Sequence, residues 1–458
     1  MKAAVVGAGW AGLAAATVLR QAGCDVTVYE SGHTPGGRAR RVPHPPQGGF
    51  DTPLDNGQHI LLGAYTDTLA LMRRLGRDPD ALFLRLPLCL ASLDGDFRLA
   101  APRLPAPLHA AAALLGARGL GWADRLACLR LMRGLRAAGW RAVQGETVAA
   151  LLRRHGQPAR AVQRLWEPLC LAALNTPLEQ ACAQLYANVL RDSLGGPRPA
   201  TDMLLPRTDL SALWADAAAA RCTMRYGHTV QAVVPARDGV QIDGERHDAA
   251  VVAVPPAIAA RLLAPGPARD VVAGMDRLPH APIATLNLKL RRPWTLPRPM
   301  MMLTEDRARG HDGQWLFDRT ALSQGPGLAA GTLPGARGQR GGGPAGAGAE
   351  IAVVVSAATA IASRDRAQAT QDLIRQIREQ AARAGLPAMP EVDGTALLID
   401  KRATFLAVPG MARPAQRTPW RGLALAGDWT DTGYPGVLEG AVRSGMRAAQ
   451  AILAGSTG

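Results

Sequence analysis

The sequence predicts an α/β protein in which a nucleotide-binding domain is assembled from separated parts of the chain, with a second, α+β domain inserted between them. Three observations predict it. A strand, a glycine-rich turn, a helix and a second strand follow one another within residues 2–30. Near the other end of the chain, a strand ending in Gly427-Asp428 leads through a loop into a helix. Between these two stretches, residues 80–200 are dominated by helical patterns.

The first stretch has the glycine spacing of a dinucleotide-binding βαβ unit. An apolar run over 2–6 is followed by Gly7-x-Gly9-x-x-Gly12 and then by a helical pattern over 13–19. Gly7 permits a tight turn, Gly9 lets the backbone approach a pyrophosphate, and Gly12 lets helix and strand pack closely. The alternative is an ordinary glycine turn, but a lone turn does not require the strand and helix on either side.

The ends of this unit supply the remaining contacts for a nucleotide. Trp10 and Ala11 lie in the glycine turn directly before the helix and are expected cofactor contacts. The first N–H groups and the partial positive charge of that helix attract phosphate. Glu30 ends the second strand, about 20 residues further on, where a carboxylate accepts hydrogen bonds from ribose hydroxyls. A carboxylate would also repel a 2′-phosphate.

A second glycine motif, an adjacent pair, narrows the choice of cofactor. Pro35-Gly36-Gly37-Arg38 follows the second strand. Two glycines allow close approach to a ligand, and a guanidinium suits a phosphate oxygen. This GGR resembles the flavoprotein superfamily of amine oxidases and phytoene desaturases, in which the arginine and its glycines lie along the FAD. The resemblance favours FAD over NAD and makes Gly37 and Arg38 expected FAD contacts.

Composition narrows the class of protein and its compartment. The chain has 458 residues, 48% of them hydrophobic, and a net charge of +15. The charge is scattered and no basic-aromatic motif accompanies it, so nucleic acid is not expected; the charge is either incidental or attracts an anionic membrane surface. Six widely spaced cysteines indicate reduced thiols and no metal site. Outside the glycine motif no apolar stretch is long enough to span a membrane. We expect a cytoplasmic protein, soluble or peripheral on the inner face of the membrane.

Residues 48–64 suit a loop that lines a site. The segment places Asp55, Gly57 and His59 directly before an apolar run. In the resembled superfamily the segment after GGR passes near the flavin, which makes Gly57 an expected cofactor contact. The alternative is a turn capped by Asp and Asn side chains. A helix is expected over 66–75, with Thr66 as its N-cap and Gly76 just after its end.

The middle of the chain is predicted to be a helical block. A pattern over 122–140 places apolar residues on one face and arginines on the other. Such a helix either lies on a membrane or packs its apolar face into the core. Thr176-Pro177-Leu178-Glu179 has the spacing of a capping box and predicts the start of another helix, which Gly195-Gly196 ends.

Strand signals return after residue 203. A helix is predicted over 208–220 and strands over 229–234, 240–242 and 249–254. In the resembled superfamily this segment rejoins the FAD domain, and the backbone of the residue matching Val230 meets the adenine. Alternating patterns near 283–290, 314–318 and 351–357 predict a sheet that floors a pocket. We expect 325–350 to be a flexible Gly-rich insertion without a chemical role, and 364–384 to be a helix.

The C-terminal stretch carries the second strong cofactor signal. Gly427-Asp428 ends a strand, and Gly436-Val437-Leu438 opens a helix that runs to about residue 453. A helix N-terminus stabilises an anion, and reduced flavin is anionic at its N1–C2=O edge. The resemblance places the Gly-Asp pair at the ribityl and pyrophosphate region and this helix N-terminus at the flavin.

Both ends of the chain must therefore reach one cofactor. We predict a discontinuous Rossmann-like FAD-binding domain formed by residues 1–78, 202–268 and 395–458. Residues 79–201 and 269–394 then form the inserted α+β substrate domain, which gives the amine oxidase/phytoene desaturase-like architecture.

A closer resemblance covers nearly the whole chain. Segments 55–59, 62–65, 165–177, 188–192 and 427–433 resemble the squalene-associated FAD-dependent desaturases, members of which are hydroxysqualene dehydroxylases. The middle segments are the specific ones, because the glycine motifs are common to the superfamily. The resemblance implies a long isoprenoid substrate and the reductive removal of the allylic hydroxyl of hydroxysqualene to give squalene, a step of hopanoid biosynthesis.

That reaction needs a proton donor, because hydroxide is a poor leaving group. His59, Asp55 and Asp431 are the candidates, since each lies in a segment expected near the flavin. Two alternatives stay open: a carotenoid-type polyene desaturase that uses the same FAD site, and a non-catalytic lipid-handling partner. The sequence identifies no electron donor.

Overall fold

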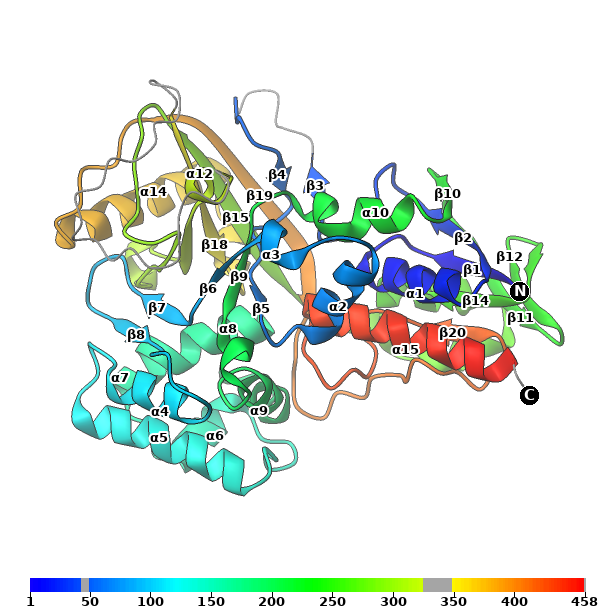
Figure 1. Cartoon of the computed structure of the whole chain (residues 1–458), viewed down its shortest axis with the longest axis horizontal. Coiled ribbons are helices and arrows are strands. Elements are labelled where there is room, and N and C mark those ends of the chain that lie inside the picture. The colour runs from blue at the N-terminus through cyan, green and yellow to red at the C-terminus, as the bar shows by residue number, and fades with distance from the viewer. Residues whose placement is uncertain (43–48, 324–347, 457–458) are drawn as a thin grey trace.

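The computed structural model describes residues 1–42, 49–323 and 348–456. Figure 1 shows a nucleotide-domain sheet with both termini at one end of the molecule, an antiparallel sheet at the other end, and a helical block below that sheet. Within the described residues no helix combines the length and apolarity needed to cross a membrane. The predicted Gly-rich insertion lies outside the described residues except for its last three positions, and Ala349 and Glu350 already belong to a strand.

A parallel five-stranded sheet forms the nucleotide domain, as predicted. Val5 pairs with Val28 on one side and Val251 on the other, so the N-terminal strand is central. The strands, in spatial order, are β10 (Thr223–Tyr226), β2 (Asp25–Glu30), β1 (Lys2–Val6), β14 (Ala249–Val252) and β20 (Leu423–Leu425). Three separated parts of the chain therefore build one sheet, which is the discontinuity predicted from the two glycine signals.

Two helices cover one face of this sheet, and a small antiparallel sheet covers the other. Helices α1 (Trp10–Gln21) and α15 (Leu438–Ser456) pack side by side on the face that carries Ala3 and Val5. The alternate residues Ala4 and Val6 join the core cluster of the opposite face. Strands β11 (Val233–Ala236), β12 (Gly239–Ile242) and β13 (Glu245–His247) lie there. The strand predicted to begin at residue 229 thus begins at Val233, which leaves Val230 in a connecting segment.

The second sheet is antiparallel and belongs to the inserted domain. Its order is β16 (Met300–Met302), β17 (Trp315–Asp318), β18 (Ala349–Val355), β15 (His280–Leu290) and β19 (Val392–Phe405). Helix α14 (Arg366–Arg383) covers one face, with Asp365 as its N-cap. Helix α12 (Arg319–Ser323) contacts β18, and α13 (Thr359–Ser363) contacts β15. The 14-residue β19 runs across residue 395, where we placed a domain boundary; the division into domains stays a prediction.

Short strands join the two domains. β5 (Leu61–Leu62) and β6 (Phe83–Leu86) both pair with β9 (Met203–Pro206). The other short elements are β3 (Arg41–Val42), β4 (Leu54–Asp55), β7 (Cys89–Ala91), β8 (Arg98–Ala100), α2 (Thr66–Arg74), α3 (Pro79–Leu82), α10 (Asp216–Ala219) and α11 (Pro256–Leu263). Helix α2 is the one predicted over 66–75. Its N-cap is Tyr65 rather than Thr66, because the buried Glu439 carboxylate of α15 accepts hydrogen bonds from its first N–H groups.

The helical block below the antiparallel sheet confirms that this part of the chain is helical, decides between two alternatives for one helix and corrects the start of another. It comprises α4 (Leu108–Leu115), α5 (Trp122–Ala137), α6 (Val148–Arg154), α7 (Ala159–Ala161), α8 (Glu167–Leu174) and α9 (Ala183–Asp192). Leu131 and Leu135 of α5 are buried, so its apolar face packs into the core and does not lie on a membrane. The predicted capping box at Thr176 starts no helix, since α9 begins only at Ala183.

Thr176 and its neighbour Asn175 instead tie the block to the antiparallel sheet. Thr176 donates its hydroxyl to the Leu174 carbonyl and accepts the Ala407 N–H. Asn175 ends α8 in the left-handed conformation, at φ 49°. Its amide donates to the Ala281 carbonyl and to the Thr404 hydroxyl, while its carbonyl accepts the Ala357 N–H at 2.6 Å.

Asn175→Ala should therefore destabilise the protein by about 3 kcal/mol, because three buried hydrogen bonds are lost and alanine disfavours positive φ. Urea unfolding followed by tryptophan fluorescence measures this free energy. Asn175→Gly loses the same hydrogen bonds without the backbone penalty, so it should be less destabilising by about 1 kcal/mol. Wild-type stability of both variants would contradict this role.

Candidate functional site

One large cavity collects the predicted cofactor contacts. It measures about 700 Å³ and is lined by all three parts of the nucleotide domain, by the antiparallel sheet and by the helical block. The lining contains Gly7, Gly9, Trp10, Ala11, Glu30, Gly37, Arg38, Gly57, Val230, Gly427, Asp428, Gly436, Val437 and Leu438. Gly12 is the one predicted cofactor residue outside it.

The glycines near the N-terminus form a cradle that side chains would fill. A Cβ on Gly37 would lie 2.9 Å from the Gly9 Cα, so the two backbones face one another closely. Gly12 cannot carry a Cβ because it would collide with the Gly7 carbonyl oxygen. Gly12 thus packs helix on strand, as predicted, and supports the cradle from behind. No side chain caps the N-terminus of α1, which leaves its positive end to a ligand at the cavity.

The carboxylate of Glu30 is fixed at the edge of this cradle. It accepts hydrogen bonds from the Ala8 and Gly32 N–H groups, both at 2.8 Å. The chain after β10 reaches the same place, because the N–H of His228 donates to the Glu30 carbonyl at 3.0 Å. Val230, two residues further on, lines the cavity and is 5% exposed. The acid and the segment expected at adenine are therefore neighbours.

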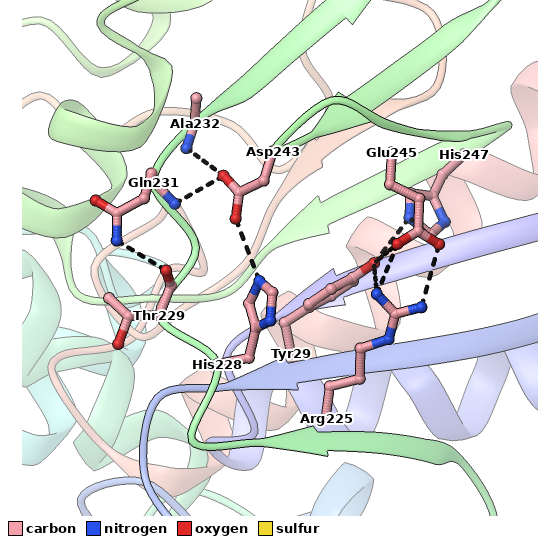
Figure 2. A network of polar contacts seen from close by, with 9 residues as sticks. All are labelled: Tyr29, Arg225, His228, Thr229, Gln231, Ala232, Asp243, Glu245 and His247. Carbon is pink, nitrogen blue, oxygen red and sulfur yellow. Dashed lines mark hydrogen bonds and ion pairs between the residues drawn. The ribbon is translucent and has the colours of Figure 1, made fainter.

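A polar network holds this end of the cavity together (Figure 2). The Tyr29 hydroxyl lies 3.0 Å from His247 Nε2 and accepts a hydrogen bond from Arg225 at 3.2 Å. Burial raises the pKa of Tyr29 to about 12, so the hydroxyl keeps its proton and can donate to Glu245. His228 stacks edge-on against the Tyr29 ring. Tyr29 and His228 both line the cavity.

An ion pair joins the N-terminal and C-terminal signals. Arg38 Nη2 lies 2.6 Å from Asp428 Oδ1, and Arg38 Nη1 donates to the Ala403 carbonyl. The Asp428 side chain is 7% exposed, whereas Arg38 is 41% exposed toward the cavity. The carboxylate of Asp428 raises the pKa of Arg38 further, so the guanidinium keeps its charge. Residues that the sequence separates by 390 positions thus meet on one wall.

The second helix N-terminus also opens on the cavity. Gly436, Val437 and Leu438 line it where α15 begins. The positive ends of α1 and α15 therefore face the same space, as expected for a ligand with separate anionic regions.

Apolar side chains from two further parts of the fold gather in another part of the cavity lining. The antiparallel sheet contributes Met300, Trp315 and Phe317, and α8 and α9 contribute Leu169 and Leu190. This half of the cavity lies against the half that carries the cofactor contacts. These apolar side chains suit contact with a hydrocarbon.

Of the three candidate proton donors, only His59 reaches the cavity. Its Nδ1 lies 2.7 Å from the Gly57 carbonyl, which places a proton on Nδ1, since a carbonyl can only accept. Burial lowers the pKa of His59 below its ordinary value of 6.5. The imidazole is therefore neutral at neutral pH, with Nε2 free to accept a proton.

Asp55 and Asp431 lie away from the cavity. Asp55 is in β4 and accepts the Leu210 N–H at 3.0 Å; burial raises its pKa to about 7. The side chain of Asp431 is 67% exposed and lies 3.7 Å from Arg413. Asp55 and Asp431 therefore contact neighbouring protein groups, and neither lines the cavity in which a substrate would lie.

Comparison with known proteins decides the family. Residues 10–453 match the family described as flavin containing amine oxidoreductase. The chain belongs to this family. The hydroxysqualene dehydroxylase of Rhodopseudomonas palustris is 30% identical over 98% of both chains. The hydroxysqualene dehydroxylase of Sinorhizobium fredii is 27% identical over 98% of this chain and 97% of its own. A probable zeta-carotene desaturase of Synechococcus elongatus is 25% identical over 99% of this chain and 98% of its own.

Solved structures confirm the fold. An oxidoreductase from Methanosarcina mazei superposes with a TM-score of 0.67 at 15% identity, over 98% of this chain and 100% of its own. The predicted fold class and the predicted similarity to hydroxysqualene dehydroxylases are both confirmed. The protein is an FAD-dependent oxidoreductase, which favours an enzyme over the lipid-handling partner.

Three independent features of the cavity fit FAD. The Gly9–Gly37 cradle leaves space that any side chain would occupy, Glu30 presents a fixed carboxylate, and two helix N-termini face inward. Arg38 and Asp428 would hold the region between the two helix ends.

Arg38→Met should weaken FAD binding about 100-fold, because it removes the guanidinium and leaves the Asp428 carboxylate buried and unpaired. Quenching of flavin fluorescence on titration of the apoprotein measures the dissociation constant. Arg41→Met is the matched control: Arg41 pairs with Asp209 and Asp216 outside the cavity and should bind FAD as the wild type does. Equal affinities of the two variants would refute the assignment.

Sequence reasoning missed two groups that line the cavity. Tyr65 precedes α2, and burial raises its pKa well above 10. Tyr434 donates its hydroxyl to Asp192 and accepts from Arg443 at 2.9 Å. The Gly433 carbonyl next to Tyr434 accepts from Asn188, so the 188–192 segment holds the loop before α15. Tyr65 belongs to the 62–65 motif, and Asp192, the partner of Tyr434, belongs to the 188–192 motif. These motifs carry no information on which side chains face the cavity.

Proposed function

We propose that this protein reductively removes the allylic hydroxyl of hydroxysqualene to give squalene. One observation carries the proposal: the apolar half of the cavity adjoins the cofactor half in a chain whose relative of 30% identity, over 98% of both chains, is a hydroxysqualene dehydroxylase. A long isoprenoid needs an apolar channel, and the sheet and helix side chains supply one.

The chain's own residues have three tasks in this reaction. Reduced FAD, when bound, supplies the hydride chemistry. Met300, Trp315 and Phe317 exclude water and hold the hydrocarbon against the cofactor half. A side chain at the junction of the two halves must deliver a proton to the departing hydroxyl oxygen.

His59 is the proposed proton donor, acting through Nε2. Its lowered pKa makes the imidazolium a stronger acid than an ordinary histidine, although less of it is present at neutral pH. The phenol of Tyr65 is the second candidate, because its raised pKa keeps it protonated throughout the neutral range. Both side chains line the cavity, whereas Asp55 and Asp431 do not.

Anaerobic turnover tests the proposed function. The FAD-loaded protein is reduced with dithionite and mixed with hydroxysqualene, and the products are identified by mass spectrometry. We expect squalene to form in step with reoxidation of the flavin. Hydroxysqualene that is recovered unchanged while the flavin stays reduced would contradict the proposal.

The second candidate function is carotenoid-type desaturation, favoured by the similarity to a probable zeta-carotene desaturase. It runs in the opposite redox direction. Oxidised protein incubated with a polyene would then yield a product with an additional double bond and reduced flavin, and the reduced protein would leave hydroxysqualene untouched.

We also propose that the protein works as a peripheral membrane protein on the cytoplasmic side. Its proposed substrate is an isoprenoid that partitions into lipid, and its net charge of +15 favours an anionic surface.

A further inference from the structure

The exposed apolar side chains in the described part of this protein are concentrated in one segment of the chain. Eight large apolar residues are strongly exposed in the described part of the chain, and five of them lie between residues 104 and 126. These are Leu104, Leu108, Leu115, Trp122 and Leu126. Trp122 is 68% exposed and Leu108 is 55% exposed. We call this set the α4–α5 patch.

The patch is built from two helices that contact one another. Leu108 and Leu115 are seven residues apart and therefore share the outward face of α4. Trp122 and Leu126 are four residues apart on the outward side of α5. A short connection joins the helices, and Figure 1 shows α5 along the lower edge of the helical block with α4 next to it. The buried face of α5, which carries Leu131 and Leu135, is a different face.

The surroundings of the patch are basic. Between residues 97 and 145 the sequence has eight arginines, no lysine and a single acid, Asp124. That acid is 9% exposed and accepts the Gly121 N–H at the start of α5, so it presents no charge to a partner. Arg130, Arg133 and Arg136 are exposed along α5, and the Arg125 guanidinium lies over the Trp122 ring. Just outside this segment the exposed Asp96 lies 3.8 Å from Arg164, so the field around the patch is mainly basic. Apolar side chains within a mainly basic field suit an anionic lipid bilayer.

Only a thin apolar layer separates the patch from the reaction cavity. A small side cavity of about 20 Å³ lies behind α4 and α5 and is lined entirely by apolar residues, including Ala113, Leu114 and Met132. Four of its lining residues, Leu88, Leu90, Leu169 and Leu194, also line the main cavity. The apolar half of the main cavity therefore lies directly behind the patch.

We infer that the α4–α5 patch is the surface by which this protein docks on an anionic bilayer, with the apolar half of its cavity facing the lipid. The role of this surface in substrate uptake rests on the proposed isoprenoid substrate. The position and charge of the patch do not depend on that proposal. Trp122, Leu108 and Leu126 enter the interface, and the arginines contact lipid phosphates. A lipid-soluble substrate then reaches the cavity between α4 and α5 without crossing water.

Co-sedimentation of the FAD-loaded protein with vesicles tests the surface. We expect binding to phosphatidylglycerol/phosphatidylcholine vesicles that weakens in 0.5 M NaCl. In Trp122→Ser/Leu126→Ser the partition coefficient should fall about tenfold or more, because two apolar side chains no longer enter the interface. Tyr226→Ser is the matched control: Tyr226 is 39% exposed on β10, far from the patch, and should bind like the wild type.

Three results would overturn the inference. They are no vesicle binding by the wild type, an equal loss of vesicle binding in the Tyr226 variant, and vesicle binding that is unchanged in 0.5 M NaCl. A patch that instead pairs two copies of the chain would appear in sedimentation velocity as a dimer that Trp122→Ser/Leu126→Ser converts to monomer, with no vesicle binding. Retained FAD absorbance in each variant shows that it is folded.

Turnover separates this inference from the proposed function. The double variant should convert hydroxysqualene dispersed in detergent as fast as the wild type does, yet convert vesicle-embedded hydroxysqualene about tenfold more slowly. If the wild type converts neither form, the proposed function fails while the vesicle-binding result still decides the docking surface. If the variant loses both activities equally, the docking surface fails.

Discussion

Gly37→Val should abolish FAD binding. A Cβ at residue 37 would lie 2.9 Å from the Gly9 Cα, and Gly37 has φ +60°, where a β-branched residue is strained. The new side chain would fill the cradle at the N-terminus of α1, where the pyrophosphate is expected. Backbone atoms cannot yield to it, because Gly9 is held at the start of α1 and bridges to Gly36. We expect the purified protein to lack the flavin absorbance near 450 nm and to stay colourless with added FAD.

The matched control for this variant is Gly76→Val. Gly76 has φ +74°, so it imposes a similar backbone strain, but a Cβ there meets no atom within 4 Å and the residue is remote from the cavity. It should lose about 1–2 kcal/mol of stability and keep its flavin. Loss of flavin in both variants would show that backbone strain, and not the cradle, is responsible. Full FAD binding by Gly37→Val would remove this glycine from the cofactor site.

The cofactor half of the site could be predicted from sequence because its chemistry is local. Gly7, Gly9 and Gly12 stand where a turn, a close approach and a helix packing each forbid a Cβ, and those constraints act within one βαβ unit. Glu30 follows from the length of the same unit. The helix N-terminus after Gly436 is equally local. These predictions need no knowledge of the rest of the chain.

The structure of the substrate half could not be predicted in the same way, because it depends on contacts between residues far apart in the sequence. The Thr176 stretch looks like a capping box, yet its hydroxyl accepts an N–H from residue 407 and no helix starts there. Strand β19 gave no periodic signal, because its exposure does not alternate regularly and its partner lies more than 100 residues away. Asp55 stands four residues before His59, but only His59 reaches the cavity.

The amphipathic helix over 122–140 shows most clearly what a sequence pattern cannot predict. Its hydrophobic stripe predicted either a membrane surface or a core face, and the structure places that stripe in the core. The exposed apolar residues Trp122 and Leu126 lie on another side of the same helix, beside those of α4. Their proposed role in docking depends on the neighbouring helix α4 and on the cavity behind it, and neither can be seen without the fold.

His59→Ala should reduce turnover about 100- to 1000-fold while FAD stays bound, because a positioned proton donor contributes about that factor. His59 is the one predicted donor in the cavity, and its Nδ1 contact to the Gly57 carbonyl leaves Nε2 to the substrate. Single-turnover reoxidation of the reduced flavin by hydroxysqualene measures the rate, and flavin fluorescence titration measures the affinity. His59→Gln keeps a polar group of similar reach without an ionisable proton, so it should be as slow as the alanine variant.

The pH dependence distinguishes His59 from Tyr65. Burial lowers the pKa of His59, so the donating imidazolium becomes more abundant only as pH falls through a value below 6.5. The wild-type rate should therefore rise on acidification, by up to about tenfold per pH unit above that pKa, and His59→Gln should lose this dependence. The raised pKa of Tyr65 keeps its phenol protonated from pH 5 to 9, so a reaction that depends on Tyr65 would show a flat profile and would fail in Tyr65→Phe. A flat wild-type profile together with an active His59→Ala variant would transfer the proton-donor role from the imidazole to the phenol.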